Sequence, residues 1–580
     1  MIDATNRNTA LASALVDELR RAGAQSAVIA PGSRSSPLAL ALDREAGIDL
    51  RVVLDERSAG FVALGLALST GRPAIVACTS GSAAANLHPA VVEADQAGVP
   101  LIVLTSDRPP ELREIGAGQT IDQVGLYGSA PRWFSEVGTH EADEAGILHM
   151  RSTGSRAIAE AILGRGPVHL NLSWRDPLGP EPRAGDVTAV SRTALEGRSG
   201  GRPLTTGLSG REPSEGLATA LAEAISGADR GLIVAGRIAD RSLARPISAL
   251  AAATGFPVLA DITSQLRFGS HDRSPVVAAY DLILRHEAPD LTPDFVIRFG
   301  DMPTSKALRG WLTATGADQI VVDPAGRWNE PTRVAGAFVR AEPAATIAAV
   351  LPRLTSDPAG AGGWLSRWTG SEQAAQEAID SVLADGSLSE PAVQRLLATT
   401  YGEGDRVLIA SSMPIRDAEA FAAGSEAEVT VHSNRGANGI DGLPSTAAGI
   451  AAGSGAPTWL VLGDLAFAHD LGGLAAVAAT DALVRIVVID NGGGGIFDFL
   501  PQAGQVDPER FAALFTTPSQ MDVGAAARAF GIEYVEVRDA DGLTGLAAAT
   551  ESVIAHVPLD RSGNVALHGE VASAVAGALG

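Results

Sequence analysis

The stretch AQSAVIAPGSRSSPLALALDREAGIDLRVVLDE, residues 24–56, indicates the fold of the chain. It contains two short runs of apolar and β-branched residues, separated by an amphipathic stretch of about 15 residues. Two further apolar runs, RPAIVACTSG and VPLIVLTSD, follow with helical stretches between them. Such alternation is typical of βαβ units, in which parallel strands are covered by helices. The sequence therefore predicts an α/β domain built on a mainly parallel sheet.

Two breaks in this alternation divide the chain into three consecutive α/β domains. The segments between the domains are rich in proline, glycine and polar residues and keep no helical or strand period. Composition of this kind is typical of linkers. We predict domains at residues 1–185, 216–353 and 373–580, with linkers at 186–215 and 354–372.

The composition limits the partners of the chain. With 580 residues, 46% of them hydrophobic, the chain is globular and long enough for several cores. The net charge of −23 argues against nucleic acid or an anionic membrane surface as a partner. A single cysteine, Cys78, excludes an intramolecular disulfide framework. The polar first residues and the lack of an apolar run of about 18 residues predict a cytoplasmic protein without a secretory signal.

Unusual polar residues follow the predicted strands at their carboxyl ends. In the first domain they are residues 31–34, 55–56 and 107–108, and in the third domain they are Asp464 and Asn491. Open parallel sheets bind ligands outside the carboxyl ends of their strands. We therefore expect a ligand site at these ends.

Residues 487–500, VVIDNGGGGIFDFL, place four glycines directly after an apolar strand. Their spacing matches neither the dinucleotide motif G-x-G-x-x-G nor a P-loop. Asn491 follows Asp464 by 27 residues, an interval that fits a strand, a crossover helix and a parallel neighbour. The carboxylate, the amide and a bared backbone carbonyl would be oxygen ligands suited to Mg²⁺. The alternative is an aspartate and an asparagine that only terminate strands.

Glu56 is the candidate acid of the first domain. It lies between the apolar strand IDLRVVLD and the apolar helix AGFVALGLAL, so we expect its carboxylate at a dry end of the sheet. Apolar surroundings raise the pKa of a carboxyl group and let it share a proton with a neutral base. The alternative is an exposed acid at the start of a helix, where it stabilises the helix dipole.

These features together resemble the thiamine diphosphate enzyme superfamily, in which a Gly-Asp…Asn motif holds Mg²⁺ and the diphosphate. The chain has Leu465 and Asp490 where many members have a glycine and an asparagine. Five segments, in order, resemble one branch more closely, the 2-succinyl-5-enolpyruvyl-6-hydroxy-3-cyclohexene-1-carboxylate synthase family of menaquinone biosynthesis. They are APGSRSSPLALAL, DERSAGFVALGLA, TSDRPPELREIGAGQTIDQ, SNRGANGIDGLPSTAAGIA and GDLAFAHDLGGL.

The resemblance implies the reaction, a transferase reaction of carboligase type. The family decarboxylates 2-oxoglutarate on thiamine diphosphate and adds the carbanion to isochorismate, with Mg²⁺ or Mn²⁺ holding the diphosphate. Glu56 would be the catalytic residue that protonates the aminopyrimidine, and Ile440 would hold the cofactor in its bent form. A homodimer or homotetramer with active sites at the subunit interface is the expected assembly.

Three sets of site residues follow from the same resemblance. The metal ligands are Asp464, Asn491 and Gly493. The cofactor-binding residues are Ser411, Ile440, Gly463, Asp464, Leu465, Ala466, Asn491, Gly493, Ile496 and Phe497. The substrate-binding residues are Ser33, Arg34, Arg108, Gln119, Lys306, Ser412, Arg416 and Arg435. Arginine and amide donors suit substrates that carry several carboxylates.

Lys306 has a second distinction, because it is the one lysine of the chain. It occupies a lysine position of the family, but Ala307 follows where the family commonly has arginine. The alternative is a lysine that survived a compositional pressure towards arginine.

Three other functions remain possible from the sequence. Another thiamine diphosphate carboligase or decarboxylase, such as an acetolactate synthase, would lack the arginines of PGSRS and SNRGANGID. A non-catalytic binding protein on the same fold would not need Glu56, Asp464 and Asn491 together. A nicotinamide dehydrogenase is disfavoured because the dinucleotide motif is missing.

Overall fold

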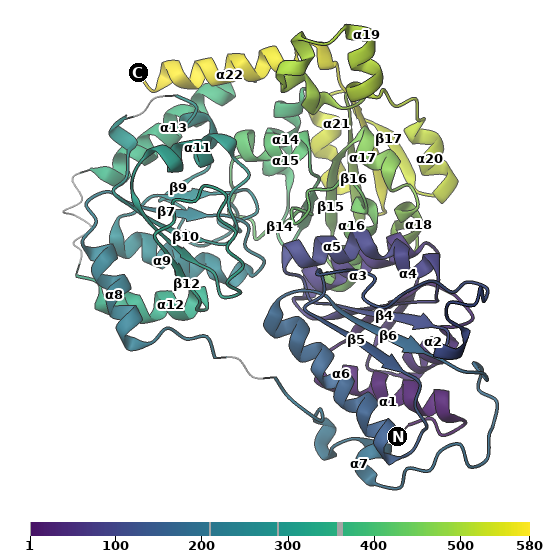
Figure 1. The fold of residues 1–580 in the computed structure, drawn as a ribbon. Coiled ribbons are helices and arrows are strands. Elements are labelled where there is room, and N and C mark those ends of the chain that lie inside the picture. Colours follow the sequence, from purple (N-terminus) through teal and green to yellow (C-terminus); the bar gives the residue numbers. More distant parts are fainter. Residues whose placement is uncertain (1, 208–209, 287–288, 356–362) are drawn as a thin grey trace. The chain divides into compact units, whose positions relative to one another are not determined.

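Three six-stranded sheets, each surrounded by helices, form the computed structural model of the chain (Figure 1). Every strand pair in these sheets is parallel. This confirms the predicted architecture of three α/β domains with parallel sheets. The structure describes residues 2–207, 210–286, 289–355 and 363–580. 

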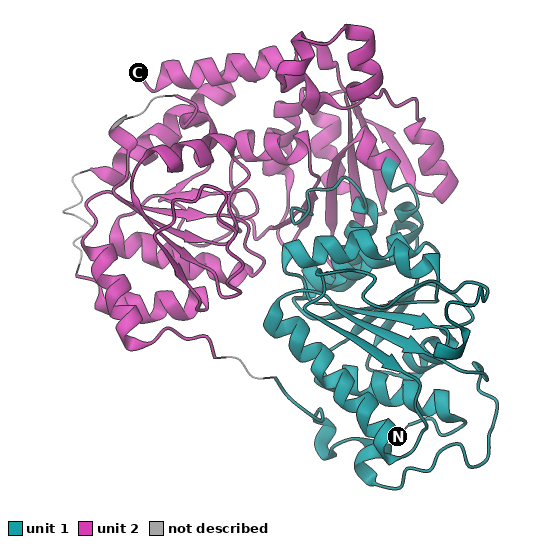
Figure 2. Ribbon diagram, viewed as in Figure 1, with its two compact units in different colours: residues 1–209, 434–455, 469–482 teal, residues 210–433, 456–468, 483–580 magenta. Residues whose placement is uncertain are grey.

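The chain divides into two compact units that do not follow the sequence order (Figure 2). Unit 1 comprises residues 1–209, 434–455 and 469–482, and unit 2 comprises residues 210–433, 456–468 and 483–580. Two segments of the predicted third domain therefore belong with the first sheet. 

The first sheet lies in unit 1, with the strand order β2-β1-β3-β4-β6-β5. Its strands are β1 (Ser26–Ile29), β2 (Asp49–Val52), β3 (Ala74–Cys78), β4 (Leu101–Asp107), β5 (Trp133–Gly138) and β6 (Val168–Ser173). The helices of this unit are α1 (Arg7–Ala22), α2 (Ser36–Arg44), α3 (Glu56–Thr70), α4 (Ser82–Asn86), α5 (His88–Ala97), α6 (Glu144–Gly164), α7 (Arg192–Glu196), α16 (Leu443–Ser454) and α18 (Gly473–Ala478). One apolar core packs against α1 and α6, and a second packs against α3 and α5.

Helices α3 and α16 touch through their backbones. A Cβ atom added at Gly65 would lie 2.2 Å from the Thr446 carbonyl oxygen, and one added at Gly449 would lie 2.1 Å from the Val62 carbonyl oxygen. Only glycine allows this approach. The contact ties residues 434–455 to the helix that Glu56 begins.

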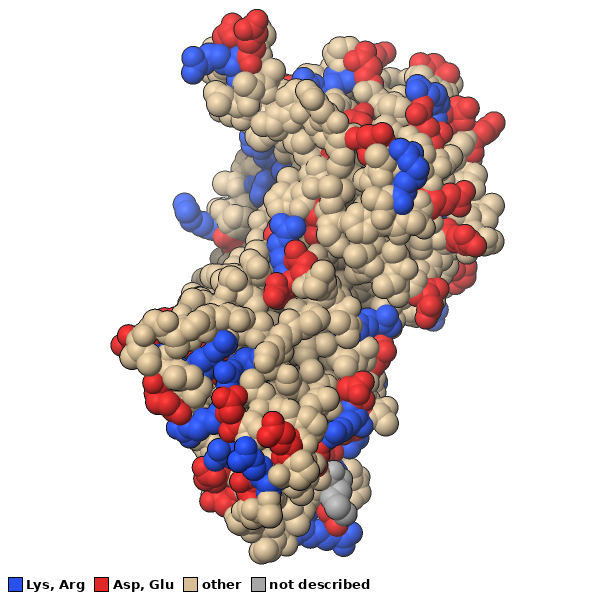
Figure 3. All heavy atoms as spheres, turned by 90° about the vertical axis from the view of Figure 1, so that its right-hand side faces the viewer, with Lys and Arg blue, Asp and Glu red and all other residues tan. Residues whose placement is uncertain are grey.

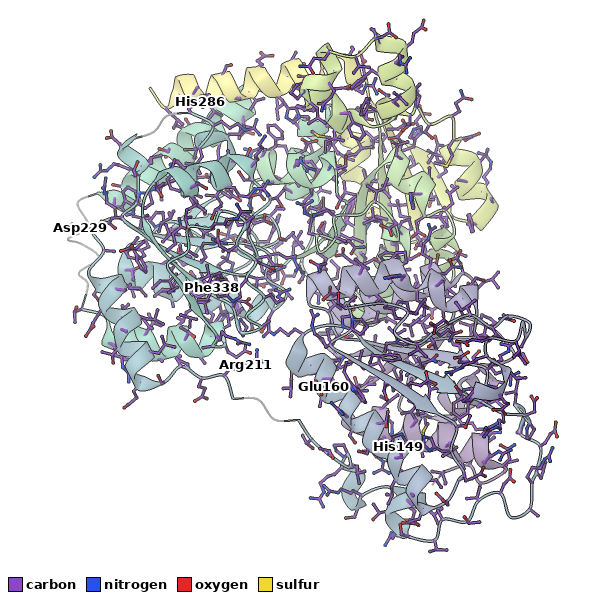
Figure 4. All side chains as sticks on the ribbon, in the orientation of Figure 1. His149, Glu160, Arg211, Asp229, His286 and Phe338 are labelled. Carbon is purple, nitrogen blue, oxygen red and sulfur yellow. The ribbon has the colours of Figure 1, made fainter. Side chains whose placement is uncertain are left out.

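The second sheet lies in unit 2, with the order β12-β11-β10-β7-β8-β9. Its strands are β7 (Gly231–Ala235), β8 (Val258–Ala260), β9 (Val276–Val277), β10 (Phe295–Phe299), β11 (Asp318–Val322) and β12 (Ala337–Val339). Its helices are α8 (Glu215–Ser226), α9 (Ala244–Thr254), α10 (Tyr280–Ile283), α11 (Lys306–Ala314), α12 (Pro343–Val350) and α13 (Trp364–Val382). On β12, Phe338, labelled in Figure 4, stacks on Trp328 with 4.3 Å between ring centroids.

The third sheet also lies in unit 2, with the order β14-β13-β15-β16-β18-β17. Its strands are β13 (Arg406–Ile409), β14 (Thr430–His432), β15 (Thr458–Gly463), β16 (Val484–Asp490), β17 (Glu533–Glu536) and β18 (Val553–Pro558). The helices of this part of the chain are α14 (Glu390–Thr400), α15 (Met413–Phe421), α17 (Asp464–His469), α19 (Pro508–Phe511), α20 (Val523–Phe530), α21 (Ala540–Gly545) and α22 (Asn564–Ala578).

The predicted linker at 354–372 needs a correction. Residues 356–362 lie outside the described residues, and residues 364–372 belong to helix α13. The side chains of Trp364 and Trp368 are fully buried in a core of the second sheet, so this segment packs rather than links. Two short helices, α17 and α18, also replace the single crossover helix expected between β15 and β16.

The surface charge and the helix hydropathy complete the description of the fold. On the face shown in Figure 3, acidic and basic side chains are interspersed. Among the described residues, no helix is both long enough and apolar enough to cross a membrane.

Candidate cofactor and substrate site

The ends of β15 and β16 bring the predicted metal ligands together. The two strands are parallel neighbours, and Gly463 pairs with Ile489, so Asp464 and Asn491 follow at the same end of the sheet. The interval between Asp464 and Asn491 in the sequence predicted this pairing of β15 with β16. Asp464 is 3% exposed, and its Oδ2 atom and the Oδ1 atom of Asn491 are buried without a hydrogen-bond partner in the described part of the chain. Unpartnered buried oxygens are costly, which favours a ligand for them.

Electrostatics at this end favour a cation. Burial and the nearby Asp490 carboxylate raise the pKa of Asp464 to about 7, although backbone N–H groups, including that of Gly493, act in the opposite direction. The Gly493 carbonyl accepts the Gly495 N–H at 2.9 Å and keeps a second lone pair. One carboxylate, one amide oxygen and one carbonyl are hard ligands of the kind that Mg²⁺ prefers. No cluster of three His, Cys, Asp or Glu side chains suited to a metal occurs among the described residues, and this donor set does not require one.

The glycines at 493, 494 and 495 are surrounded by close contacts, whereas Gly492 has open space at its Cβ position. Gly493 has φ 132°, and a Cβ atom there would lie 2.3 Å from the Thr516 carbonyl oxygen. The N–H of Gly494 donates to that same carbonyl at 2.7 Å. A Cβ atom at Gly495 would lie 2.5 Å from Nδ2 of Asn491. These contacts explain glycine at 493 and 495 and exclude a slack linker.

The remaining cofactor candidates of unit 2 lie around this end of the sheet. Ile496 and Phe497 are half-buried, and the Phe497 ring lies 5.7 Å from that of Phe515. Ser411 and Ala466 are buried, whereas Gly463 and Leu465 are half-buried.

Ser412 and Arg416 meet at the start of α15. Ser412 has φ 73°, which is uncommon for a residue with a side chain, and Arg416 Nη1 donates to its carbonyl at 2.6 Å. Burial lowers the pKa of Arg416, and Arg309 lowers it further, although Asp417 raises it. Arg309 lies on α11, the helix that the exposed Lys306 begins. The sequence analysis missed Arg309, although its i+3 spacing from Lys306 places both cations on one helix face.

Arg34, Arg108 and the neutral amide of Gln119 lie in one part of unit 1. Arg108 Nη1 donates to the Ser80 hydroxyl, and Gln119 Nε2 donates to the Ser80 carbonyl at 2.8 Å. Arg34 donates to the Trp174 carbonyl at 2.9 Å, and its positive charge helps burial lower the pKa of Arg108. Two neighbouring guanidinium groups at the carboxyl ends of β1 and β4 are suited to an anion. Ser33, just before Arg34, is exposed.

A buried polar network that the sequence analysis missed supports this cluster. Gln123 Oε1 accepts the Gly81 N–H at 2.9 Å, and Gln123 Nε2 donates to Asn171 at 2.9 Å. Asn171 in turn donates to Asp107 at 3.0 Å, and Asp107 accepts the Arg108 N–H at 2.7 Å. Its residues lie far apart in the sequence, so only the motif GAGQTIDQ, which ends at Gln123, could have indicated it.

Glu56 lies in an environment that differs from the expected one. It is the first residue of α3, and Asp55 caps this helix by accepting the Ser58 N–H at 3.0 Å. Glu56 is half-buried, and the nearby side chains of Val52 and Leu54 are 66% and 85% exposed. Because β2 is an edge strand, it lacks a neighbour on one side of the first sheet, so the described residues of unit 1 enclose Glu56 less than predicted.

The segment that carries Arg435 and Ile440 also belongs to unit 1. Both carboxylate oxygens of Glu93 on α5 accept backbone N–H groups of this segment, from Gly436 at 2.8 Å and from Ala437 at 2.7 Å. A pocket of about 540 Å³ lies beside it, lined by Phe61, Ala85, His88, Pro89, Val92, Glu93, Asn434, Ala437, Gly439 and Asp441. The glutamate therefore holds the loop of Arg435 and Ile440 next to a cavity.

Comparison with known proteins gives the class of the chain. Residues 9–126 match the family "Thiamine pyrophosphate enzyme, N-terminal TPP binding domain", and residues 427–559 match the corresponding "C-terminal TPP binding domain". Residues 222–409, between them, match "Middle domain of thiamine pyrophosphate". The three matches, in this order, define a thiamine pyrophosphate enzyme.

Curated relatives narrow this class. The 2-succinyl-5-enolpyruvyl-6-hydroxy-3-cyclohexene-1-carboxylate synthase of Bacillus velezensis is 40% identical over 91% of this chain and 90% of its own length. The synthase of the same name from Haloarcula marismortui is 42% identical over 92% of each chain, and that of Myxococcus xanthus is 39% identical over 99% of this chain and 98% of its own. The chain belongs to this synthase family. The relatives favour it over the acetolactate synthase alternative.

Proposed function

We propose that the chain decarboxylates 2-oxoglutarate and joins the resulting carbanion to isochorismate, with thiamine diphosphate and Mg²⁺ or Mn²⁺ as cofactors. The observation that carries the proposal is the pair of buried oxygens, Asp464 Oδ2 and Asn491 Oδ1, that lack hydrogen-bond partners in the described part of the chain. They lie at the ends of adjacent parallel strands, where ligands of open sheets bind. Family membership supports the same substrates, because the names of the relatives describe the coupled product.

The metal ligands, the apolar wall and the acid of the proposed site would each have a separate task. Asp464, Asn491 and the Gly493 carbonyl would hold the metal ion, which neutralises the diphosphate charge. Ile440, Ile496 and Phe497 would provide the apolar wall around the cofactor. Thiamine diphosphate, when bound, supplies the electron-accepting thiazolium that decarboxylation requires. Glu56 would hold a proton at the aminopyrimidine nitrogen, as a positioned acid does.

The substrates carry several carboxylates, which the cations of the site would bind. Arg34, Arg108 and Gln119 of unit 1 are one such group, with the exposed Ser33 beside them. Lys306, Ser412 and Arg416 of unit 2 are another, extended by Arg309, and Arg435 belongs to the loop beside the cavity of unit 1. Guanidinium forks orient planar carboxylates through two parallel hydrogen bonds. Ala307 after Lys306 leaves this second group without the arginine that is common in the family.

A direct assay tests the proposal. Purified protein is incubated with thiamine diphosphate, Mg²⁺, 2-oxoglutarate and isochorismate, and the coupled product is identified by its mass. We expect product, and we expect Arg435→Ala to weaken substrate use, whereas Arg528→Ala, a change at an exposed arginine paired to Asp522 at 3.8 Å, leaves it unchanged. Release of CO₂ without the coupled product would contradict the proposal and indicate a simple decarboxylase.

A homodimer is the assembly that we propose, with a homotetramer as the alternative. Two observations support it: the apolar side chains of Val52 and Leu54 are exposed, and the dry environment that Glu56 needs is incomplete. The superfamily resemblance supports an active site shared between subunits. The expected partners are otherwise small molecules, and the cytoplasmic location stays a prediction from the sequence.

A further inference from the structure

The amide of Asn491 has a buried carboxylate behind it. Asn491 Nδ2 donates to Glu390 Oε1 at 2.9 Å, and Asn564 Nδ2 donates to the same oxygen at 2.9 Å. Glu390 is the first residue of α14, whose N-cap, Ser389, accepts the Ala392 N–H at 3.3 Å. Only 3% of Glu390 is exposed, so water does not compete effectively for these hydrogen bonds.

This contact decides how the amide of Asn491 is oriented. A carboxylate accepts hydrogen bonds, so the side of the amide that faces Glu390 must be the N–H side. The amide oxygen, Oδ1, then points the opposite way, where it is buried and has no hydrogen-bond partner among the residues that the structure describes. Without Glu390, the Asn491 amide could turn over and point its N–H side towards the metal site. An N–H group donates hydrogen bonds and does not bind a cation.

Glu390 is itself held from three sides. Its carboxyl group interacts with that of Asp417 on α15, which is itself buried. His568 of α22 lies 3.3 Å from Asp417 Oδ1, and the Phe421 and Phe499 rings pack on its imidazole, each at 4.9 Å between centroids. The consecutive helices α14 and α15 and the distant helix α22 thus meet behind a single amide.

We propose that Glu390 is a positioning residue for the metal site: it orients the Asn491 amide so that Oδ1 faces the cation. Asn564 and Asp417 hold Glu390 in place and connect the start of the C-terminal helix to the site. The inference rests on the proposed function, because it requires that Asn491 bind the metal ion.

The experiment is a Mg²⁺ titration of the full chain with thiamine diphosphate in excess, followed by tryptophan fluorescence. Glu390→Ala is expected to raise the dissociation constant for Mg²⁺ about 10- to 100-fold, the usual range for residues that orient a metal ligand. Glu390→Gln is expected to stay within about threefold, because its Oε1 accepts the same N–H and its amide donates to Asp417. Turnover of Glu390→Ala should recover at saturating Mg²⁺, which a merely structural role does not predict.

Glu372→Ala is the matched control. Glu372 on α13 is another hydrogen-bonded carboxylate of unit 2, half-buried where Glu390 is buried, and it accepts the Ala279 N–H at 2.8 Å and a hydrogen bond from Gln376 at 2.7 Å. Its loss should leave the Mg²⁺ affinity unchanged. Glu390→Asp, which withdraws the carboxylate by one methylene, serves if the alanine variant does not fold, and it should weaken Mg²⁺ binding at least about threefold.

Unchanged Mg²⁺ affinity in Glu390→Ala or, where that variant is unfolded, in Glu390→Asp would overturn the inference. Equal weakening in Glu390→Gln and Glu390→Ala would also overturn it, because the glutamine keeps the orienting hydrogen bond. Failure of the unsubstituted protein to bind Mg²⁺ and thiamine diphosphate would instead reject the proposed function, so the two failures are distinguishable.

Discussion

The proposed chemistry needs two acids that follow strand ends, Asp464 after β15 and Glu56 after β2. The two acids differ in how far the surrounding residues bury them. Asp464 is almost fully buried, and its partner ligand Asn491 is hydrogen-bonded to the buried Glu390. Glu56 is half-buried and lies near the exposed Val52 and Leu54. Strand position explains the difference, because β15 and β16 are central in their sheet and β2 is an edge strand.

This difference concerns how far strand neighbours within one unit enclose each acid. A central strand end is enclosed by its neighbours, so unit 2 by itself buries Asp464 and brings it next to Asn491, the two residues that we propose as metal ligands. An edge strand end is open on one side, so the acid side needs a further surface to exclude water. Exposed apolar residues at such an edge are typical of an interface.

The largest expected effect is that of Glu56→Gln. A glutamine cannot transfer a proton, so turnover should fall by about 10² to 10⁴-fold, the range for a positioned acid or base. Because the metal side lies in the other unit, the Mg²⁺ affinity should stay as in the unsubstituted protein. Steady-state turnover and a Mg²⁺ titration measure the two quantities separately. Near-normal turnover would remove Glu56 from the mechanism.

Leu54→Arg tests whether the open edge is a subunit interface. Burial of a leucine contributes about 1.5–3 kcal/mol, so its loss should weaken association by about 10- to 150-fold. Sedimentation velocity over a concentration series measures this change. Val190→Arg is the control, because Val190 is an equally exposed apolar residue outside that edge. An unaltered oligomeric state in the Leu54 variant would place the interface elsewhere.

Gly493→Ala tests whether the metal side is as rigid as its contacts indicate. The added methyl group would meet the Thr516 carbonyl at a φ of 132°, so the free energy of unfolding should fall by about 1–3 kcal/mol. Chemical denaturation measures this change. Gly504→Ala should have little effect, since Gly504 has open space around its Cβ position and no positive φ. A fully tolerated alanine at 493 would mean that the loop rearranges freely.

The last expected effect concerns the buried His169 on β6, in the sheet of unit 1. Burial lowers the pKa of His169 to about 3, and Thr105 Oγ1 lies 2.7 Å from its Nε2 atom. The unfolded chain binds a proton at this histidine below its ordinary pKa of 6.5, whereas the folded chain does not. Stability should therefore decrease by about 1.4 kcal/mol per pH unit as the pH falls from 6.5 towards 3.

Urea unfolding at about pH 7 and about pH 5 measures the effect of His169. His169→Gln should show a weaker dependence on pH over this interval, because glutamine does not titrate. An equal slope in both proteins would assign the pH dependence to other groups.

Local spacing made the proximity of Asp464 and Asn491 predictable. Asp464 and Asn491 follow two strands that are consecutive in the sheet, so one interval in the sequence was enough to place them together. The sequence distinguished the four glycines from nucleotide-binding motifs, but it did not show why glycine is needed there. The atoms that a side chain would meet belong to Phe515 and Thr516, which lie beyond the loop in the sequence. Glu390 was missed for the same reason, since it lies 101 positions from Asn491.

The sequence by itself determined the three parallel α/β domains, the family and the residues that end each strand, because hydrophobic period and motif order are local properties of the chain. The tertiary structure alone decided which of those ends are enclosed. Strand order made β2 an edge and left Glu56 open, and helices distant in sequence placed Glu390 behind Asn491. Burial and hydrogen bonding depend on which residues become neighbours in the folded chain, and the order of residues in the sequence does not give these neighbours. They determine what each polar residue can do.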